Sequence, residues 1–283
     1  MKAYLSVCTL YKDEARYLPE WLEFHRLMGV ERFFLYNNNS TDDHMQVLAP
    51  YIEEGTVVQR DWPLFPGQYE AFRECLKDHS DDSRWIVFHD LDEFLFSPGG
   101  RQLPDILRDF EEYPGVVVNS IFYGTSGHET PPEGLVIENY TRRIALAAGR
   151  NRIVKSIINP ARTETTGNVS HYFRYVDRKK AVNENREAVA GESTREVSVN
   201  LLRINHYFTR SRQERLHKIW TPRVHTGVLL PRPEEAEARD ERLNEEVDEI
   251  LVPYAPAVRA ALAARAAGTP LPVGSLEAAL ASA

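Results

Sequence analysis

The sequence predicts an α/β protein in which a mixed, mainly parallel sheet is flanked by helices. Two observations predict this class. Apolar, β-prone segments alternate with segments of helical period over residues 3–122, and such alternation favours parallel strands with helices on the faces of the sheet. Polar loops also follow three expected strands at their carboxyl ends, at residues 9–14, 37–42 and 90–93, which is where ligands bind in open α/β sheets.

The first 122 residues supply the expected elements in order. A buried strand over residues 3–10 is followed by a helix that opens at Asp13 and Glu14 and stops at Gly29. The buried face of this helix is predicted to carry Leu18, Trp21, Leu22, His25 and Met28. The other strands are expected at 32–36, 56–60, 85–89 and 115–122, and the other helices at 43–53, 67–79 and 103–112.

Beyond residue 125 the alternation weakens. Residues 135–146, 152–158 and 199–208 are predicted to be strands of a mixed region. Residues 234–251 are predicted to form a charged helix with a solvated face of i,i+4 pairs. Its expected buried stripe consists of Leu243, Val247, Ile250 and Leu251. The Ala-rich residues 255–283 predict a marginal helix at the end of the chain.

Composition excludes several classes of protein. The chain has 283 residues, with 34 Lys and Arg against 42 Asp and Glu, and a net charge of −8. A hydrophobic content of 42 % excludes disorder, and the acidic balance argues against a nucleic-acid partner, which usually meets a basic face. Cys8 and Cys75 are expected to be reduced core residues.

The sequence contains neither a signal-peptide pattern nor a stretch of about 20 apolar residues. It therefore predicts a cytoplasmic protein without a transmembrane segment. Peripheral contact with a membrane stays open as an alternative.

Three carboxylates follow the strand expected at residues 85–89. Asp90 and Asp92 are two positions apart, so in extended chain they would share a face. Adjacent carboxylates repel unless a cation joins them, and hard divalent cations often bridge a carboxylate to substrate phosphates. The pattern therefore indicates a metal that holds a diphosphate, with a solvated acidic turn as the alternative.

His206 follows a second apolar strand and precedes two aromatic residues. A packed core histidine is the ordinary interpretation of such a residue. If His206 faces the acidic turn, it would be a further metal ligand, and a shell of oxygen and imidazole ligands favours Mn²⁺ over Ca²⁺.

The chain resembles glycosyltransferase family 92 and its bacterial relatives, which have the GT-A fold. The matching blocks occur in the family's order over residues 5–218: Lys12-Asp13-Glu14 with Glu20-Trp21 and His25, Asn37 to Asp42, Gln68 with Cys75, Asp90 to Phe94, Phe122 to His128, Lys155-Ser156-Ile157, and Asn205-His206-Tyr207 with Arg210-Ser211. The chain departs from the family pattern at Asp13, which is usually Asn, at Asn37, which is commonly Asp, and at Tyr123.

The resemblance implies a metal-dependent hexosyltransferase that moves a sugar from a nucleotide-sugar, expected to be a UDP-sugar, to a hydroxyl of a glycan or small-molecule acceptor with inversion. Mn²⁺ or Mg²⁺ is the implied cofactor. The catalytic domain would span residues 1–225, with a nucleotide-binding half over about 1–96 and an acceptor half over about 97–225. Residues 226–283 would be a helical C-terminal extension.

Residue roles are also carried over from the resemblance. Asp92 and His206 are implied as metal ligands, and Asp90 is expected to hold the ribose or to reach the metal through water. The nucleotide is expected near Thr9, Glu14, Asn38, Asp42 and Gln68. One of Lys155 and Arg210 is expected to contact the diphosphate, with exposed surface charge as the alternative for both.

Inversion requires a general base near the acceptor hydroxyl. His128, Glu129 and Glu93 are the candidates, and His128 could instead position the donor sugar. His171, Trp62 and Trp220 are further candidates on the acceptor side.

Two alternative functions stay open. A phosphatase of the haloacid dehalogenase type also has an Asp-x-Asp after an apolar strand, although its motif usually lies near the start of the chain. A non-catalytic protein that binds a sugar nucleotide or a glycan on the same fold is the other alternative.

Overall fold

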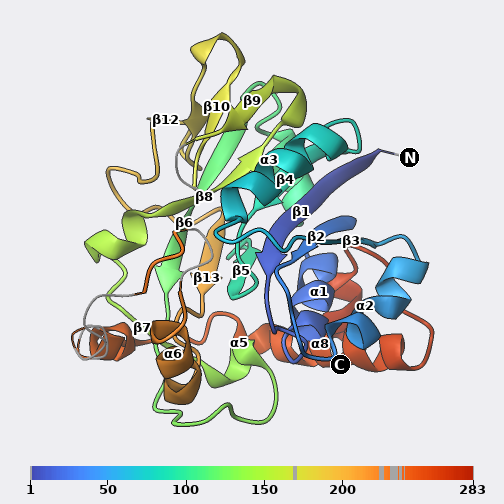
Figure 1. Ribbon diagram of the computed structural model, residues 1–283, viewed down its shortest axis with the longest axis vertical. Coiled ribbons are helices and arrows are strands. Elements are labelled where there is room, and N and C mark those ends of the chain that lie inside the picture. The colour runs from blue at the N-terminus through green and yellow to red at the C-terminus, as the bar shows by residue number, and fades with distance from the viewer. Residues whose placement is uncertain are drawn as a thin grey trace.

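The computed structural model describes residues 2–167, 171–222, 226–229, 235, 238 and 240–282. Its central sheet runs in the order β12-β11-β6-β8-β4-β1-β2-β3, and β13 joins it by pairing with β6 and with β5. Strands of the first half pair in parallel, β1 with β2 and β4, and β2 with β3. Helices lie against this sheet (Figure 1), so the predicted α/β class is confirmed.

The first half of the chain follows the predicted order closely. Its strands are β1 (Ala3–Tyr11), β2 (Arg32–Asn37), β3 (Val57–Asp61), β4 (Ser83–Phe88), β5 (Glu93–Phe96) and β6 (Gly115–Phe122). Its helices are α1 (Leu18–Leu27), α2 (His44–Glu53), α3 (Gln68–His79) and α4 (Leu103–Arg108). The first helix begins at Leu18 and not at Asp13, because Asp13 has a left-handed backbone with φ of 53°.

The second half is built from shorter elements. They are α5 (Val136–Asn139), β7 (Arg142–Arg143), β8 (Val154–Ile158), β9 (Thr163–Thr166), β10 (Phe173–Tyr175), β11 (Ala181–Val182), β12 (Ala188–Val189), β13 (Arg203–His206), α6 (Arg212–Ile219), β14 (Glu246–Val247), α8 (Ala255–Ala266) and α9 (Leu276–Ser282). β8 is antiparallel to β4 and β6. The predicted strand over 135–146 is wrong, since this segment holds a short helix and a two-residue strand.

The predicted helix over 234–251 is confirmed only at its start, because residues 235, 238 and 240 are helical but the helix does not continue beyond Asp240. The chain forms a short 3₁₀ helix at Glu241–Asn244 and then strand β14, which pairs with β7. Asp248 forms ion pairs with Arg143 and Arg203, and this anchors the segment to the sheet region. Residues 234, 236, 237 and 239 lie outside the described residues.

The sheet separates two apolar clusters. The larger one contains Trp21, Trp85 and most of the buried face of α1, together with Ala257, Val258 and Ala261 of α8. The smaller one contains Cys8 and Cys75, which are buried, free cysteines. No helix among the described residues is both long and apolar enough to cross a membrane.

Helix α8 packs on α1, and polar contacts reinforce this packing. Arg265 Nε donates to Glu23 Oε1 at 2.9 Å, and Arg26 Nη2 donates to the carbonyl oxygen of Leu271 at 3.0 Å. The Ala-rich end of the chain is therefore helical, as predicted, but its helices belong to the main core and are not marginal.

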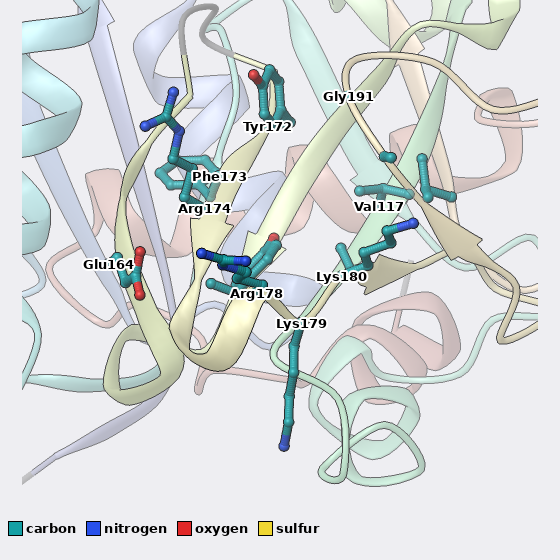
Figure 2. A pocket seen from close by; sticks show the side chains of 13 residues that line it. Val117, Glu164, Tyr172, Phe173, Arg174, Arg178, Lys179, Lys180 and Gly191 are labelled. Atoms are coloured by element: carbon teal, nitrogen blue, oxygen red, sulfur yellow. The ribbon is translucent and has the colours of Figure 1, made fainter.

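A groove of about 380 Å³ lies between the β9–β10 hairpin and the β11–β12 segment, with Val117 of β6 among the residues that line it (Figure 2). The lining includes four cationic side chains of residues 174–180.

Candidate active site

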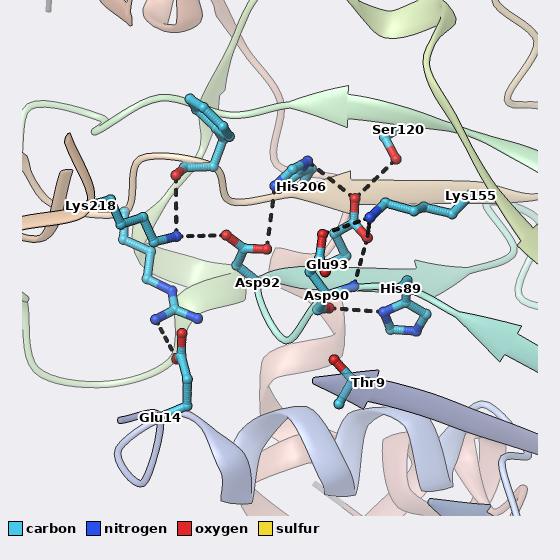
Figure 3. A network of polar contacts seen from close by, with 12 residues as sticks. Thr9, Glu14, His89, Asp90, Asp92, Glu93, Ser120, Lys155, His206 and Lys218 are labelled. Atoms are coloured by element: carbon cyan, nitrogen blue, oxygen red, sulfur yellow. Dashed lines mark hydrogen bonds and ion pairs between the residues drawn. The ribbon is translucent and has the colours of Figure 1, made fainter. Parts of the chain in front are cut away.

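Strand pairing brings the acidic turn and His206 together. The chain leaves β4, turns at Leu91 and Asp92, and re-enters a sheet as β5. β5 is antiparallel to β13 in a register that places Glu93 opposite His206. Because β13 is also parallel to β6, residues of β6 lie beside the same group. Figure 3 shows the resulting cluster at the carboxyl ends of β1 and β4.

Lys155 joins two carboxylates in the interior of the cluster. Its Nζ lies 2.6 Å from Asp90 Oδ2 and 3.2 Å from Glu93 Oε2. Gln68 Nε2 donates to the other oxygen of Asp90 at 2.7 Å, and Ser120 Oγ donates to Glu93 Oε1 at 3.2 Å. Since Lys155 is only 2 % exposed, the alternative of an exposed surface charge is wrong for this residue.

Asp92, His206 and Lys218 form the outer part of the cluster. His206 Nε2 lies 3.3 Å from Asp92 Oδ1, and Lys218 Nζ donates to Asp92 Oδ2 at 2.7 Å. On its other side, His206 Nδ1 lies 3.2 Å from Glu93 Oε1. The imidazole therefore stands between two carboxylates, and helix α6 supplies a cation to the outer one.

Burial and nearby cations oppose each other at the three carboxyl groups. Burial would raise the pKa of Asp92, but Lys218 and His206 outweigh it and hold this pKa well below its ordinary value. Burial is likewise outweighed at Asp90, where Lys155 lowers the pKa. At Glu93 burial exceeds the attraction of Lys155 and His206, so the pKa is raised.

The geometry fits a divalent cation held by two protein ligands. Two ligands about 2.1 Å from an octahedral ion and at right angles lie about 3 Å apart, close to the 3.3 Å between Asp92 Oδ1 and His206 Nε2. Asp90 instead directs its oxygens toward Lys155 and Gln68. Over the described ranges, no three or more His, Cys, Asp or Glu side chains are arranged to hold a metal by themselves, so substrate phosphates and water would complete the shell.

Glu14 and Arg210 form a buried ion pair beside this cluster. Arg210 Nη1 donates to Glu14 Oε2 at 2.6 Å, and the guanidinium carbon lies 3.7 Å from the centre of the Tyr17 ring. Arg210 is 4 % exposed, so exposed surface charge is wrong here also. Thr9 is fully buried on β1, and Figure 3 shows it on the same side of the cluster as Glu14.

Asn38 and Asp42 bind the backbone of neighbouring loops. Asn38 Nδ2 donates to the carbonyl oxygens of Trp62 and Leu64 at 2.7 and 2.9 Å. Asp42 Oδ2 accepts a hydrogen bond from the Ala15 amide at 2.7 Å. These contacts shape the loops at the ends of β1 and β2, and direct nucleotide contact by either side chain stays a prediction.

His128 and Glu129 lie at the start of α6 and outside the cluster of Figure 3. Their carbonyl oxygens accept hydrogen bonds from the amides of Arg212 and Gln213, both at 2.9 Å. The Glu129 side chain is 75 % exposed and pairs with Arg212 at 3.4 Å. His128 Nε2 lies 3.0 Å from the carbonyl oxygen of Asn139.

The remaining acceptor-side candidates differ in their surroundings. His171 Nδ1 lies 3.0 Å from the carbonyl oxygen of Val154, and burial lowers its pKa to about 3. Trp62 Nε1 donates to the carbonyl oxygen of Gly67 at 2.9 Å, which holds its ring in the loop after β3. Trp220 is 64 % exposed at the end of α6.

Sequence reasoning missed Lys218 and Ser120. Lys218 follows the last matched block and is one of four Arg or Lys residues between positions 210 and 218. Nothing in this spacing ranks one of them above the others. Ser120 reaches Glu93 only because β13 brings β5 and β6 together, and no local pattern reports that pairing.

Comparison with known proteins identifies the family. The profile described as "Glycosyltransferase family 92" matches residues 2–253. A protein of this family from Oryza sativa subsp. japonica is 31 % identical over 210 residues, which are 72 % of this chain and 33 % of that protein. A second, from Ricinus communis, is 31 % identical over 72 % of this chain and 35 % of its own length. The chain thus spans about a third of the length of these curated relatives.

A shorter match is to the galactan beta-1,4-galactosyltransferase GALS2 of Arabidopsis thaliana, 29 % identical over 34 % of this chain and 20 % of that protein. Solved structures are more distant. S. aureus TarS in complex with UDP is 18 % identical, with a TM-score of 0.38 over 57 % of this chain and 47 % of that chain. At this TM-score the likeness carries no functional argument. The family match over nearly the whole chain shows that this protein belongs to glycosyltransferase family 92.

Proposed function

We propose that the chain is a glycosyltransferase that moves a sugar from a nucleotide-sugar to an acceptor hydroxyl, with the help of Mn²⁺ or Mg²⁺. The observation that carries this proposal is the convergence of Asp92 and His206 beside the Asp90–Lys155 pair. Family membership and a relative named as a galactosyltransferase support it. A UDP-sugar is the donor that we propose.

Each residue of the cluster has a part in holding the donor. Asp92 and His206 would hold the metal, which supplies positive charge for the departing diphosphate when bound. Glu93 is completely buried, and its Oε1 lies 3.2 Å from His206 Nδ1 without forming a hydrogen bond, while Nε2 faces Asp92. Lys155 and Gln68 fix both oxygens of Asp90, and Asp90 is the residue that we propose to face the ribose.

Lys218 is free to reorient, because it lies on the outer side of the cluster and is 32 % exposed. We infer that its ammonium neutralises Asp92 when no donor is bound and turns to the diphosphate when the donor and the metal are present. Charge on the leaving group is thereby balanced by a cation of the chain as well as by the metal.

We propose His128 as the base of an inverting transfer. The Nε2–H group can donate to the carbonyl oxygen of Asn139, 3.0 Å away, which leaves the lone pair of Nδ1 to accept the proton of an acceptor hydroxyl. Glu93 is less suited, because it is completely buried and binds Lys155. Glu129 is directed to Arg212 on the surface.

A thermal-shift screen tests the proposal with UDP, GDP, CMP and ADP, each in Mn²⁺, Mg²⁺ or EDTA. A ligand at 100 times its Kd stabilises the folded state by about 2.7 kcal/mol. We expect UDP to raise Tm in Mn²⁺ but not in EDTA, and Asp92→Ala to abolish this rise. Asp81→Ala, which changes an exposed carboxylate, is the control and should respond like the unmodified protein.

The same screen separates the alternatives. If no nucleotide raises Tm and the protein hydrolyses p-nitrophenyl phosphate, the phosphatase interpretation replaces the transferase. If UDP-sugars bind but no UDP is released with any acceptor tested, the protein is a binding protein on a transferase fold. A rise in Tm that persists in Asp92→Ala would reject the metal assignment.

A further inference from the structure

The groove between the β9–β10 hairpin and the β11–β12 segment concentrates positive charge on an acidic protein. Arg174, Arg178, Lys179 and Lys180 line it, against a single lining carboxylate, Glu164. The chain as a whole carries a net charge of −8. Figure 2 shows these side chains on neighbouring parts of the chain, with Lys179 directed away from Arg178 and Lys180.

These four cations are not used for the protein's own ion pairs. Within the part of the chain that the structure describes, their side chains form no hydrogen bond or ion pair. Several other basic residues, among them Arg143, Arg203 and Arg265, are instead paired with buried or half-buried carboxylates. Four neighbouring cations repel one another, so a site of this kind favours an anionic ligand.

The backbone holds Arg178 in an unusual conformation. Asp177 and Arg178 have φ values of 57° and 54°, in the left-handed region that residues other than glycine adopt at a cost. Such positions are enriched at ligand sites, where surrounding structure maintains them. The chain therefore keeps a guanidinium at the groove although a local energetic penalty opposes it.

The shape of the groove favours a saccharide over a flat surface. Its volume of about 380 Å³ is within the range of small-molecule sites. Its apolar lining residues, Val117, Ala181 and Val189, are buried or half-buried, so a flat lipid headgroup layer would not reach them. Tyr172 supplies an aromatic ring beside the cations (Figure 2), and guanidinium groups bind carboxylate and phosphate oxygens in a bidentate manner.

The groove approaches the candidate active site through β8 and the residues that precede β10. Val117 is paired with Ser156 of β8, so the two side chains share one face of the sheet. Tyr172 directly follows His171, whose carbonyl oxygen accepts a hydrogen bond from Ser156 Oγ, next to Lys155. A ligand several sugars long can therefore occupy the groove and extend toward the active site.

We propose that this groove binds an anionic saccharide segment of the acceptor, one that carries carboxylate or phosphate groups. This role rests on the proposed transferase function. The acceptor would be held by its charged segment in the groove, while the hydroxyl that receives the sugar reaches the donor site.

The test measures fluorescence anisotropy of three labelled decamers in 50 mM salt: a galacturonate decamer, a decamer of glucose units joined by phosphodiesters, and a neutral glucose decamer. We expect the protein to bind one or both acidic decamers and not the neutral one. The double variant Arg174→Gln/Arg178→Gln should raise the Kd at least about tenfold, as expected when two charge-assisted contacts are lost. The acidic decamer that binds tells carboxylate from phosphate.

The control is Arg101→Gln/Arg108→Gln, which removes the same charge from side chains that are 48 % and 60 % exposed. It should bind the decamers like the unmodified protein. If both double variants bind the acidic decamers equally weakly, the groove is not the binding site, because the attraction would then come from the overall charge of the protein. Binding of none of the decamers would also reject it, and so would binding only to anionic phosphatidylglycerol vesicles, which would reassign the cations to a membrane.

A further measurement separates this proposal from the proposed function. Both double variants should keep the Tm rise produced by UDP and Mn²⁺, because none of the four replaced arginines contacts the donor site. If Arg174→Gln/Arg178→Gln loses binding of the acidic decamer but keeps the rise in Tm with UDP and Mn²⁺, the result supports the groove as the decamer site. Absence of a UDP response in the unmodified protein, with decamer binding intact, would reject the acceptor role that we assign to the groove.

Discussion

Glu20 is a buried carboxylate whose replacement should change the pH dependence of stability. It is 6 % exposed on α1, and its two oxygens accept hydrogen bonds from the amides of Val136 and Ile137 at 2.7 and 3.1 Å. Burial raises its pKa, the two amide bonds lower it, and the balance is a pKa of about 7 against an ordinary value of 4.5. Glu20 thus connects α1 to the segment after His128.

The sign of the effect follows from linkage. Because the folded protein holds this proton more tightly than the unfolded chain, the unmodified protein gains stability as pH falls from 8 through 7 toward 4.5. Integration between pH 8 and pH 5 gives about 2.5 kcal/mol for a group with these two pKa values. Glu20→Gln cannot titrate, so relative to the unmodified protein it should be about 2.5 kcal/mol more stable at pH 8 than at pH 5.

Urea unfolding followed by circular dichroism at pH 5 and pH 8 measures this difference. Glu133→Gln, which changes an exposed carboxylate, controls for the general effect of removing a charge. Its effect on the free energy of unfolding should be almost the same at pH 5 and pH 8. If the effect of Glu20→Gln on the free energy of unfolding differs by less than about 0.5 kcal/mol between pH 5 and pH 8, the two amide hydrogen bonds keep the carboxylate ionised. Burial would then not raise the pKa of Glu20.

Three further results are expected. Lys155→Met leaves the buried Glu93 and the half-buried Asp90 without their shared cation, so the free energy of unfolding in urea should fall by about 3–5 kcal/mol, and a loss under 1 kcal/mol would contradict this. Lys218→Met removes the cation that competes for Asp92, so the nucleotide-free protein should bind Mn²⁺ about two- to fivefold more tightly by calorimetric titration, and weaker binding would refute the competition. Val258→Ala leaves a cavity where α8 packs on α1 and should cost about 2 kcal/mol, checked as a lower Tm.

The first half of the fold was predictable because its signals are local. The strand expected at 115–122 has those same bounds in the structure, and the strand expected at 3–10 ends one residue later, at Tyr11. Continuous apolar runs between turn residues are sufficient to identify buried parallel strands. Strand β5 was missed because it has only four residues and depends on β13, more than a hundred positions away.

The second half was less predictable because distant contacts decide its structure. Residues 136–139 form a helix although the segment is β-prone, since Glu20 binds the amides of its first turn across 116 residues. Asp248 likewise draws its segment to Arg143 and Arg203 in place of a continuous helix. Tertiary contacts of this kind override local propensity.

The candidate site shows the same division. The resemblance identifies Asp92 and His206, which the structure brings to 3.3 Å, and it also leads to Lys155 and Arg210. It also gives the two aspartates different roles, and the turn at Leu91 directs them to different partners, Asp90 to Lys155 and Asp92 to Lys218. It gives no reason to choose Lys218, whose position depends on where α6 begins.

The contact of α8 with α1 has a consequence for how the chain folds. Arg265 and Glu23 are 242 positions apart. Closing a loop of that length costs about 3 kcal/mol more free energy, through lost chain entropy, than closing a loop of 10 residues. During synthesis, the part of α1 that packs on α8 therefore stays uncovered until the residues of α8 have been made. We expect late docking of α8 to be a slow step in folding, during which exposed α1 is the part of the molecule most prone to aggregation.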